Sequence, residues 1–330
     1  MKGQGRRAVL ASISFVLVAT LSMLMGSNQQ ATASPMWHFG EAVECRGDLT
    51  PAPPAQPMHV IGFYALGDAR TSSWTNLFGL PFPAVAEGNT DLVRELALGW
   101  YTLDAQGNLL NRTTRNAWRR PPGWETVLAT AQEFELRTEM VIHENDRSGL
   151  LTALLNDEQA MSRAVASIVQ EAVLYQGVNL NLEELGLYAV GEARQQIRDS
   201  FTRFVALLAS PLREAGKTLT LTLHPPNSSF RGYDYPALAE LADRIIVMAH
   251  DYGPRPEPLD RVVQAVEMAL VSVPRERLVL AISAPSETGE SMREKIDVAK
   301  RFQLQGISLW RLGLVTEAMW TAMRQSITGR

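Results

Sequence analysis

Residues 175–184 read YQGVNLNLEE, and this stretch decides how the chain is expected to fold. Its apolar residues stand at alternate positions, namely Val178, Leu180 and Leu182. Between and after them come the polar residues Asn179, Asn181 and Glu183. This period of two is typical of a β-strand with one apolar and one polar face. Burying a row of amides that ends in a carboxylate is costly unless a function uses it, so the stretch predicts a strand that carries Glu183 to a site.

Other short β-rich runs follow the same pattern along the chain, with helical patterns between them. Together with the first stretch, the eight predicted strands are 60–64, 93–98, 138–143, 178–182, 219–223, 244–249, 278–283 and 307–310. Apolar residues recur at helical spacing in 164–173, 201–208 and 262–270. Alternation of this kind predicts parallel βα units joined by right-handed crossovers.

Two α/β architectures share this alternation, a closed (β/α)8 TIM barrel and an open doubly wound sheet. We expect the barrel, because eight strands within the ~250 residues typical of that fold suit closure. Active residues of such barrels lie at the carboxyl ends of the strands. Aromatic, histidine and carboxylate residues collect at those ends here: Tyr64, Trp100, Tyr101, His143, Glu183, His224, His250, Asp251, Tyr252 and Trp310.

The first residues of the chain have the features of an export leader. Three basic residues precede an apolar run over 8–25, and the small residues 31–33 offer a cleavage site. We therefore expect 1–33 to be a signal peptide and the protein to be secreted or associated with the cell envelope. The apolar run is close to the ~18 residues of a membrane span, so an uncleaved anchor is the alternative and the only expected route to membrane contact.

Composition limits the other possibilities. Residues 34–57 are rich in proline and alanine without periodicity, which indicates a linker, and 58–330 then form one domain. Cys45 is the only cysteine, so stability must come from a packed core without an intramolecular disulfide. A net charge of −4 and no basic cluster argue against nucleic acid as a partner. We expect a monomer.

The spacing of Gln176, Asn179, Asn181 and Glu183 is similar to the signature of glycoside hydrolase family 18, Asp-x-x-Asp-x-Asp-x-Glu, on the fourth barrel strand. Here the glutamate is present and amides replace the aspartates. The resemblance implies that Glu183 protonates the leaving oxygen and then acts as base. It also implies substrate-assisted retention, in which the acetamido oxygen of the substrate is the nucleophile and Asn181 orients that group.

Later segments resemble the same family over 59–323. Residues 247–253 (VMAHDYG) are similar to its Met-x-Tyr-Asp segment, which places Asp251 on the aspartate and His250 on the tyrosine. Residues 306–310 (GISLW) resemble the segment whose tryptophan floors the subsite of the reacting sugar. Trp100, Tyr101 and His143 resemble its spore-germination, cortex-lytic branch. The residues expected to bind substrate are Asn179, His250, Tyr252, Trp310, Tyr64, Trp100, Tyr101 and His143.

The amide at position 181 changes the expected chemistry. Its carbonyl oxygen can accept the acetamido N–H, but it supplies no negative charge to balance an oxazolinium-like cation. Opposite charges ~4 Å apart attract by about 4 kcal/mol at an effective dielectric of 20, which sets an upper limit of about a thousandfold in rate. Asp251 is the expected substitute for this charge.

Three hypotheses about function remain open. The first is a hydrolase of N-acetylglucosamine-containing glycans, such as peptidoglycan, spore cortex or chitin-like chains. The second is a non-catalytic glycan-binding protein that lost turnover through its amides. The third is a conventional retaining glycosidase, with Glu183 and Asp251 ~5–5.5 Å apart as its carboxylate pair.

The sequence does not indicate metal or cofactor chemistry. Zinc-ligand spacings such as His-Glu-x-x-His are absent, as are a phosphate loop, a nucleophile elbow and a dinucleotide fingerprint. We therefore expect no metal and no cofactor, and a carbohydrate polymer as the partner.

Overall fold

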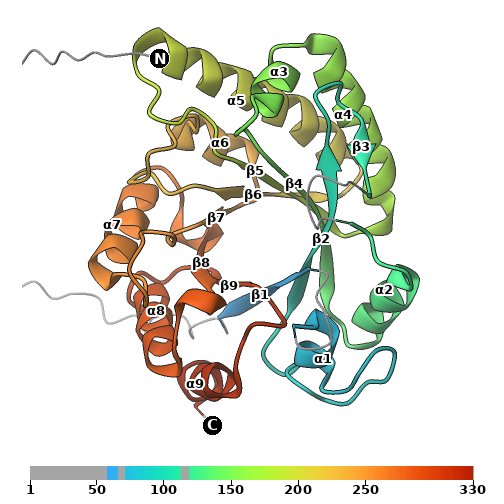
Figure 1. The fold of residues 1–330 in the computed structure, drawn as a ribbon, viewed down its shortest axis with the longest axis vertical. Helices are drawn as coiled ribbons and strands as arrows, with labels where there is room; N and C mark the ends of the chain where they lie inside the picture. The colour runs from blue at the N-terminus through green and yellow to red at the C-terminus, as the bar shows by residue number, and fades with distance from the viewer. Residues whose placement is uncertain (1–57, 66–70, 113–118, 330) are drawn as a thin grey trace, which may run out of the picture. The chain divides into compact units, whose positions relative to one another are not determined.

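A closed barrel of parallel strands forms the centre of the fold (Figure 1). The computed structural model describes residues 58–65, 71–112 and 119–329. The eight barrel strands are β1 (His59–Tyr64), β2 (Glu95–Leu103), β4 (Arg137–Asn145), β5 (Gly177–Glu183), β6 (Thr218–Leu223), β7 (Arg244–Val247), β8 (Leu278–Ser283) and β9 (Gly306–Trp310). β1 pairs in parallel with both β2 and β9, which closes the sheet and confirms the predicted TIM barrel. A short strand, β3 (Leu109–Leu110), pairs antiparallel with the end of β2.

Helices connect the strands and surround the barrel (Figure 1). They are α1 (Ser73–Phe78), α2 (Trp124–Glu133), α3 (Leu150–Leu155), α4 (Glu158–Glu171), α5 (Gly191–Glu214), α6 (Tyr235–Leu241), α7 (Leu259–Leu270), α8 (Gly289–Arg301) and α9 (Glu317–Ile327). Short 3-10 turns occur at η1 (Ala172–Leu174), η2 (Arg275–Arg277) and η3 (Ala284–Ser286). Side-chain caps fix several helix starts, as where Asp157 accepts the N–H groups of Gln159 and Ala160 at α4.

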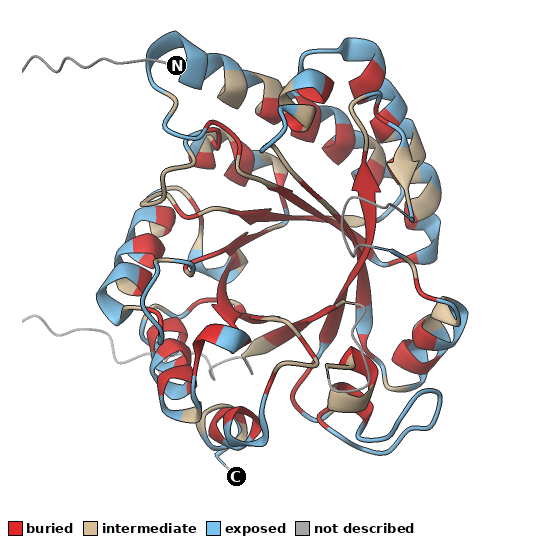
Figure 2. Ribbon diagram, in the orientation of Figure 1, coloured by how far each residue is buried: buried red, intermediate tan, exposed pale blue. Residues whose placement is uncertain are grey.

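Strand side chains alternate between the helices and the barrel interior, and both faces are largely buried (Figure 2). On β5, Val178, Leu180 and Leu182 belong to the core between strands and helices, while Asn179 and Asn181 are buried on the other face. The predicted alternation is therefore confirmed. A smaller apolar cluster fills the interior: Ile61, Phe63, Ala97, Val141, Ile246, Met248, Val279 and Ala281.

Close packing explains the glycine that begins β5. A Cβ atom on Gly177 would lie 2.3 Å from the hydroxyl oxygen of Thr218 on β6. A side chain at this position would displace the Thr218 side chain and crowd its backbone oxygen, 3.0 Å from the added Cβ. A residue without a Cβ therefore suits the close pairing of β5 and β6 along Gly177–Leu180.

Charged residues occupy the end of the barrel interior opposite the site. Arg244 Nη1 lies 3.1 Å from Glu95 Oε1 and 3.7 Å from Glu139 Oε1, and His59 contacts Glu95 at 2.7 Å. Burial, followed by the charge of Glu95, raises the pKa of Glu139 to about 8. Burial also acts to raise the pKa of Glu95, but the bonds and charges of His59 and Arg244 outweigh it and lower that pKa to about 2. We call these four residues the barrel floor.

The predicted leader 1–33 and linker 34–57 lie outside the described residues. Among the helices within the described part of the chain, none is both long and apolar enough to span a bilayer.

Candidate functional site

A cavity of about 170 Å³ lies at the carboxyl ends of the barrel strands. Its lining comes from seven strands or the residues directly after them: Phe63, His143, Asn181, Glu183, Thr222, His224, Met248, His250, Asp251, Ala281 and Trp310. The structure thus brings together six of the predicted site residues: Glu183, Asn181, Asp251, His250, His143 and Trp310. Their location matches the strand-end rule for barrels.

Glu183 is the last residue of β5 and its side chain is partly buried, with 24% exposed. Its Oε1 lies 3.4 Å from Nε2 of His143, which ends up beside it because β4 and β5 are paired in register. Burial acts to raise the pKa of Glu183. The hydrogen bond and charge of His143, the charge of His224 and a hydrogen bond from Asn181 outweigh burial, so the net pKa is lowered.

The pairing of Glu183 with His143 has a chemical consequence. A carboxylate beside an imidazole can exchange a proton with it across a hydrogen bond. The pair can therefore donate a proton to a bound ligand and take it back.

Asn181 lies two residues before Glu183 and shares its face of the strand. The side-chain amide donates a hydrogen bond to Glu183, while the carbonyl oxygen Oδ1 is buried without a hydrogen-bond partner among the described residues. A buried acceptor without a donor is unfavourable, and a ligand N–H in the cavity would satisfy it.

His224 follows β6 and also lines the cavity. Its ring stacks on Phe230 at 4.2 Å, and its Nε2 has no hydrogen-bond partner among the described residues. Burial is the main cause that lowers the pKa of His224, against the charge of Glu183, which raises it. A neutral imidazole here can donate or accept one hydrogen bond from a ligand.

His250 and Asp251 lie at the rim, after β7. His250 Nδ1 is 3.0 Å from Asp251 Oδ2, and the Asp251 side chain is 78% exposed. The bond to His250 is the main cause that lowers the pKa of Asp251. Asp251 has a left-handed backbone (φ 64°), which the buried carboxylate of Glu257 holds by accepting the N–H groups of Asp251 and Tyr252 at 3.0 and 3.1 Å.

Trp310 ends β9 and forms an apolar wall of the cavity. Its ring meets Phe63 edge to face, with ring centroids 5.5 Å apart. Trp310 therefore lies where a flat apolar surface would face a ligand bound beside Glu183.

The location predicted for Asn179 needs correction. Its amide donates to Glu139 Oε2 at 3.1 Å and its oxygen accepts from Thr222 at 2.8 Å, both inside the barrel below the cavity. Gln176 accepts from the backbone N–H and the hydroxyl of Thr138 at the start of the strand. Two of the three amides in the signature positions therefore have structural partners, and Asn181 alone of the three lines the cavity.

Four predicted aromatic residues also lie away from the cavity. Tyr64, Trp100 and Tyr101 belong to the core between strands and helices. The register of β2 against β4 shifts between Gly99 and Tyr101, so Trp100 and Tyr101 both point outward. Tyr252 instead bonds Asn227 Oδ1 at 3.0 Å, beneath Arg261.

The sequence prediction missed five lining residues: Phe63, Thr222, His224, Met248 and Ala281. A period-of-two signal was present for some of them, because Met248 stands two residues before His250. His224 is among the strand-end residues named from the sequence, but it is not in the set expected to bind substrate. Within the described residues, no group of three or more histidine, cysteine or acidic side chains is placed to hold a metal ion.

Comparison with known proteins gives fold similarity only. No family model matches the chain, and no curated protein sequence matches it. A chitinase from Chromobacterium violaceum superposes with a TM-score of 0.67 at 17% identity, over 83% of this chain and 100% of that one. The spore cortex-lytic enzyme SleL of Bacillus megaterium gives 0.66 at 15% identity, over 84% and 76%. A class V chitinase from Pseudomonas fluorescens gives 0.67 at 16% identity, over 82% and 99%.

Proposed function

We propose that this protein is a glycoside hydrolase that acts on glycans containing N-acetylglucosamine, of the peptidoglycan, spore-cortex or chitin-like kind. The observation that carries the proposal is the adjacent placement of Glu183 and Asn181 at the strand-end cavity, with the Asn181 oxygen buried and unbonded within the described residues. The similarity in fold to chitinases and a cortex-lytic enzyme supports the same class.

The proposed mechanism is substrate-assisted retention, as the resemblance to family 18 implies. Asn181 Oδ1 accepts the N–H of the substrate acetamido group and turns its oxygen toward the anomeric carbon. Glu183 protonates the leaving oxygen as the acetamido oxygen attacks the anomeric carbon and the glycosidic bond breaks. Water then attacks the anomeric carbon and opens the oxazolinium-like ring, and Glu183 takes the proton that this water loses. Trp310 supports the apolar face of the sugar ring.

A non-catalytic glycan-binding protein is the second candidate, and two observations favour it. The pKa of Glu183 is lowered, whereas a general acid at neutral pH needs a raised one. Apart from Glu183, the acid that lines the cavity among the described residues is Asp251 at the rim, whose side chain is exposed. Charge compensation for a cationic intermediate is therefore weaker than a buried carboxylate at position 181 would supply.

Hydrolysis of N-acetylglucosamine oligomers and digested cortex, measured with wild type and Glu183→Gln, tests the proposal. We expect products from wild type and a loss of about a hundredfold or more in the variant, the usual contribution of a general acid. The matched control is Glu184→Gln, because Glu184 is bonded to Arg147 at 2.6 Å and does not line the cavity. Binding by both wild type and Glu183→Gln without product from either would instead establish the glycan-binding candidate.

We also propose export, on the leader features of 1–33 alone. Fractionation of cells that express the full chain, with detection of the mature N-terminus, tests whether cleavage occurs after residue 33. A chain that stays in the membrane at full length would establish the anchor instead.

A further inference from the structure

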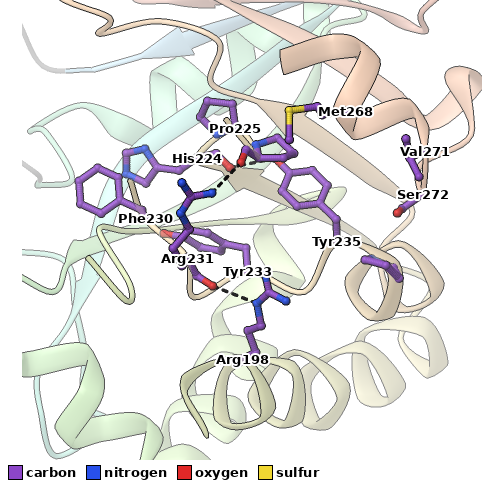
Figure 3. A pocket seen from close by; sticks show the side chains of 12 residues that line it. Arg198, His224, Pro225, Phe230, Arg231, Tyr233, Tyr235, Met268, Val271 and Ser272 are labelled. Atoms are coloured by element: carbon purple, nitrogen blue, oxygen red, sulfur yellow. Dashed lines mark hydrogen bonds between the residues drawn. The ribbon is translucent and has the colours of Figure 1, made fainter. Parts of the chain in front are cut away.

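A second, larger cavity of about 310 Å³ lies beside the first, where the loop between β6 and α6 packs against α5, α6 and α7 (Figure 3). Its walls are mainly apolar, with Phe230, Pro236 and Met268 among them. Two arginines, Arg198 and Arg231, also line it, and no aspartate or glutamate does. We call this cavity the arginine pocket.

The two guanidinium groups retain most of their hydrogen-bonding capacity. Arg198 Nε donates to the backbone oxygen of Arg231 at 3.0 Å, and Arg231 Nη1 donates to the backbone oxygen of Pro226 at 3.3 Å (Figure 3). Neither arginine forms an ion pair with another described residue. A guanidinium has five N–H donors, so each still presents several to a ligand.

The two tyrosine hydroxyls of the pocket already have partners. The hydroxyl of Tyr235 donates to the backbone oxygen of His224 at 3.0 Å, and that of Tyr233 donates to the backbone oxygen of Leu182 at 2.9 Å. The pocket therefore combines apolar walls with uncompensated positive charge. This combination complements an anionic group carried on a partly apolar body.

The arginine pocket is structurally tied to the strand-end cavity. His224 lines both, and its Nε2 has no partner among the described residues. The backbone N–H groups of Arg231 and Gly232 donate to the oxygens of Gly186 and Leu185 at 3.0 and 3.1 Å, on the loop that follows Glu183. These bonds fix the position of one arginine relative to the proposed acid.

We propose that the arginine pocket binds a carboxylate borne by the glycan, next to the sugar held at Glu183. The inference rests on the proposed function, because it identifies the substrate as an acidic glycan. A planar guanidinium can donate two parallel hydrogen bonds to the two oxygens of a carboxylate. A carboxamide is neutral and has one oxygen acceptor, so it cannot form this charged, two-bond pair. His224 lines both cavities and is the residue that such a ligand would have to pass.

A matched pair of ligands tests the proposal. The first is a β-1,4-linked N-acetylglucosamine disaccharide with a 3-O-carboxyethyl ether, and the second is the same molecule with that acid converted to the carboxamide. We expect wild type to bind the acid at least about tenfold more tightly, as for hydrogen bonds to a charged group. In the double variant Arg198→Gln/Arg231→Gln this preference should fall to about one.

Arg194→Gln is the control, because Arg194 is an exposed arginine one turn before Arg198 on α5 and lies outside the pocket. It makes the same charge change and should keep the preference. Equal binding of acid and carboxamide by wild type, a preference that survives in the double variant, or no binding of the acid would each overturn the proposal.

The two proposals fail in different ways. The unsubstituted disaccharide reports on the site around Glu183, and the double variant should bind it within about twofold of wild type. A preference for the acid in a protein that hydrolyses no sugar would remove the hydrolase and leave the pocket assignment intact. Hydrolysis without any preference for the acid would do the reverse.

Discussion

Glu183 has neighbours that act on its proton in opposite directions. Burial favours the neutral acid, while His143, His224 and Asn181 favour the carboxylate and prevail. In the family 18 signature that this stretch resembles, an aspartate stands at the position of Asn181. Its negative charge would raise the pKa of the glutamate, as burial does. In the proposed mechanism, the side chain at position 181 therefore affects both the charge available to a cationic intermediate and the protonation of Glu183.

Asn181→Asp should increase turnover of N-acetylglucosamine oligomers. The new carboxylate would raise the pKa of Glu183 by like charge and could stabilise an oxazolinium-like cation, with an upper limit of about a thousandfold. The measurement is kcat against pH for both proteins. Asn179→Asp is the control, because it makes the same amide-to-carboxylate change on the same strand face but beside Glu139, away from the cavity. It should not increase turnover. Equal or lower turnover in Asn181→Asp would contradict the assigned role of Asn181.

His143→Gln should raise the pKa of Glu183, because it removes the largest of the causes that lower it. At a given acidic pH, fewer molecules would then carry an ionised Glu183. Carboxyl-carbon NMR of the glutamates, titrated in wild type and in the variant, measures this directly and does not depend on activity. Glu183→Gln identifies the resonance. A resonance that titrates at the same pH in both proteins would show that the two side chains are not coupled.

At the scale of elements, period-two alternation predicted the eight strands in order and the two faces of β5. The prediction failed where a residue was expected to line the site only because it stands at the end of a strand. Tyr64 stands at a strand end, but Phe63 already occupies the inward position there, so Tyr64 faces the helices. That error was avoidable from the sequence. The register shift at Trp100 and Tyr101 was not, because it depends on how β2 pairs with β4.

The site residues divide in the same way. Neighbours along β5 could be placed from sequence, because Asn181 and Glu183 share a strand face. Contacts between strands, such as that of His143 with Glu183, depend on the register of the strand pairing. The loop after β7 has no repeating hydrophobic pattern from which the position of its side chains could be predicted. The contact of Glu257 with Asp251 could therefore not be predicted from the sequence, although the buried Glu257 carboxylate holds the conformation of that loop.

Glu257→Ala should weaken both the loop and the site. It leaves two backbone N–H groups without their acceptor, which costs about 1–3 kcal/mol for each group that stays buried. Lys295 bonds the Glu257 backbone oxygen at 2.8 Å, so part of the loop stays anchored to α8. We expect a lower free energy of unfolding in urea and weaker glycan binding. Glu267→Gln, an exposed change on α7, is the control. Unchanged binding in a destabilised Glu257→Ala would separate the loop from the ligand site.

At the scale of the whole molecule, the barrel has charged groups at both ends of its interior and an apolar cluster in between. The site end carries the partly exposed Glu183 and the exposed Asp251. The barrel floor is closed, and there two carboxylates share Arg244. Since like charges in a buried place cannot both ionise cheaply, Glu95 takes the charge and Glu139 keeps its proton.

This division gives the fold a pH dependence that does not involve the site. The pKa of Glu139 is raised from about 4.5 to about 8, so between these values the native state holds a proton that the unfolded chain releases. Stability contributed by Glu139 should therefore fall as pH rises from about 4.5 to 8 and stay low above that range. Glu95, with its pKa lowered to about 2, loses its contribution only as pH falls below about 4.5.

Glu139→Gln tests this at the barrel floor. The free energy of urea unfolding of wild type should decline by a few kcal/mol between pH 5 and pH 9, and the variant should show a smaller decline. The pH dependence is compared, and not the absolute stability of Glu139→Gln. The glutamine NH2 group can face the Asn179 NH2 group, two donors without an acceptor, which lowers stability at every pH. Glu133→Gln, an exposed change on α2, should leave the wild-type slope unchanged. Parallel declines in wild type and Glu139→Gln would mean that Glu139 is ionised in the native barrel and that Arg244 compensates both carboxylates.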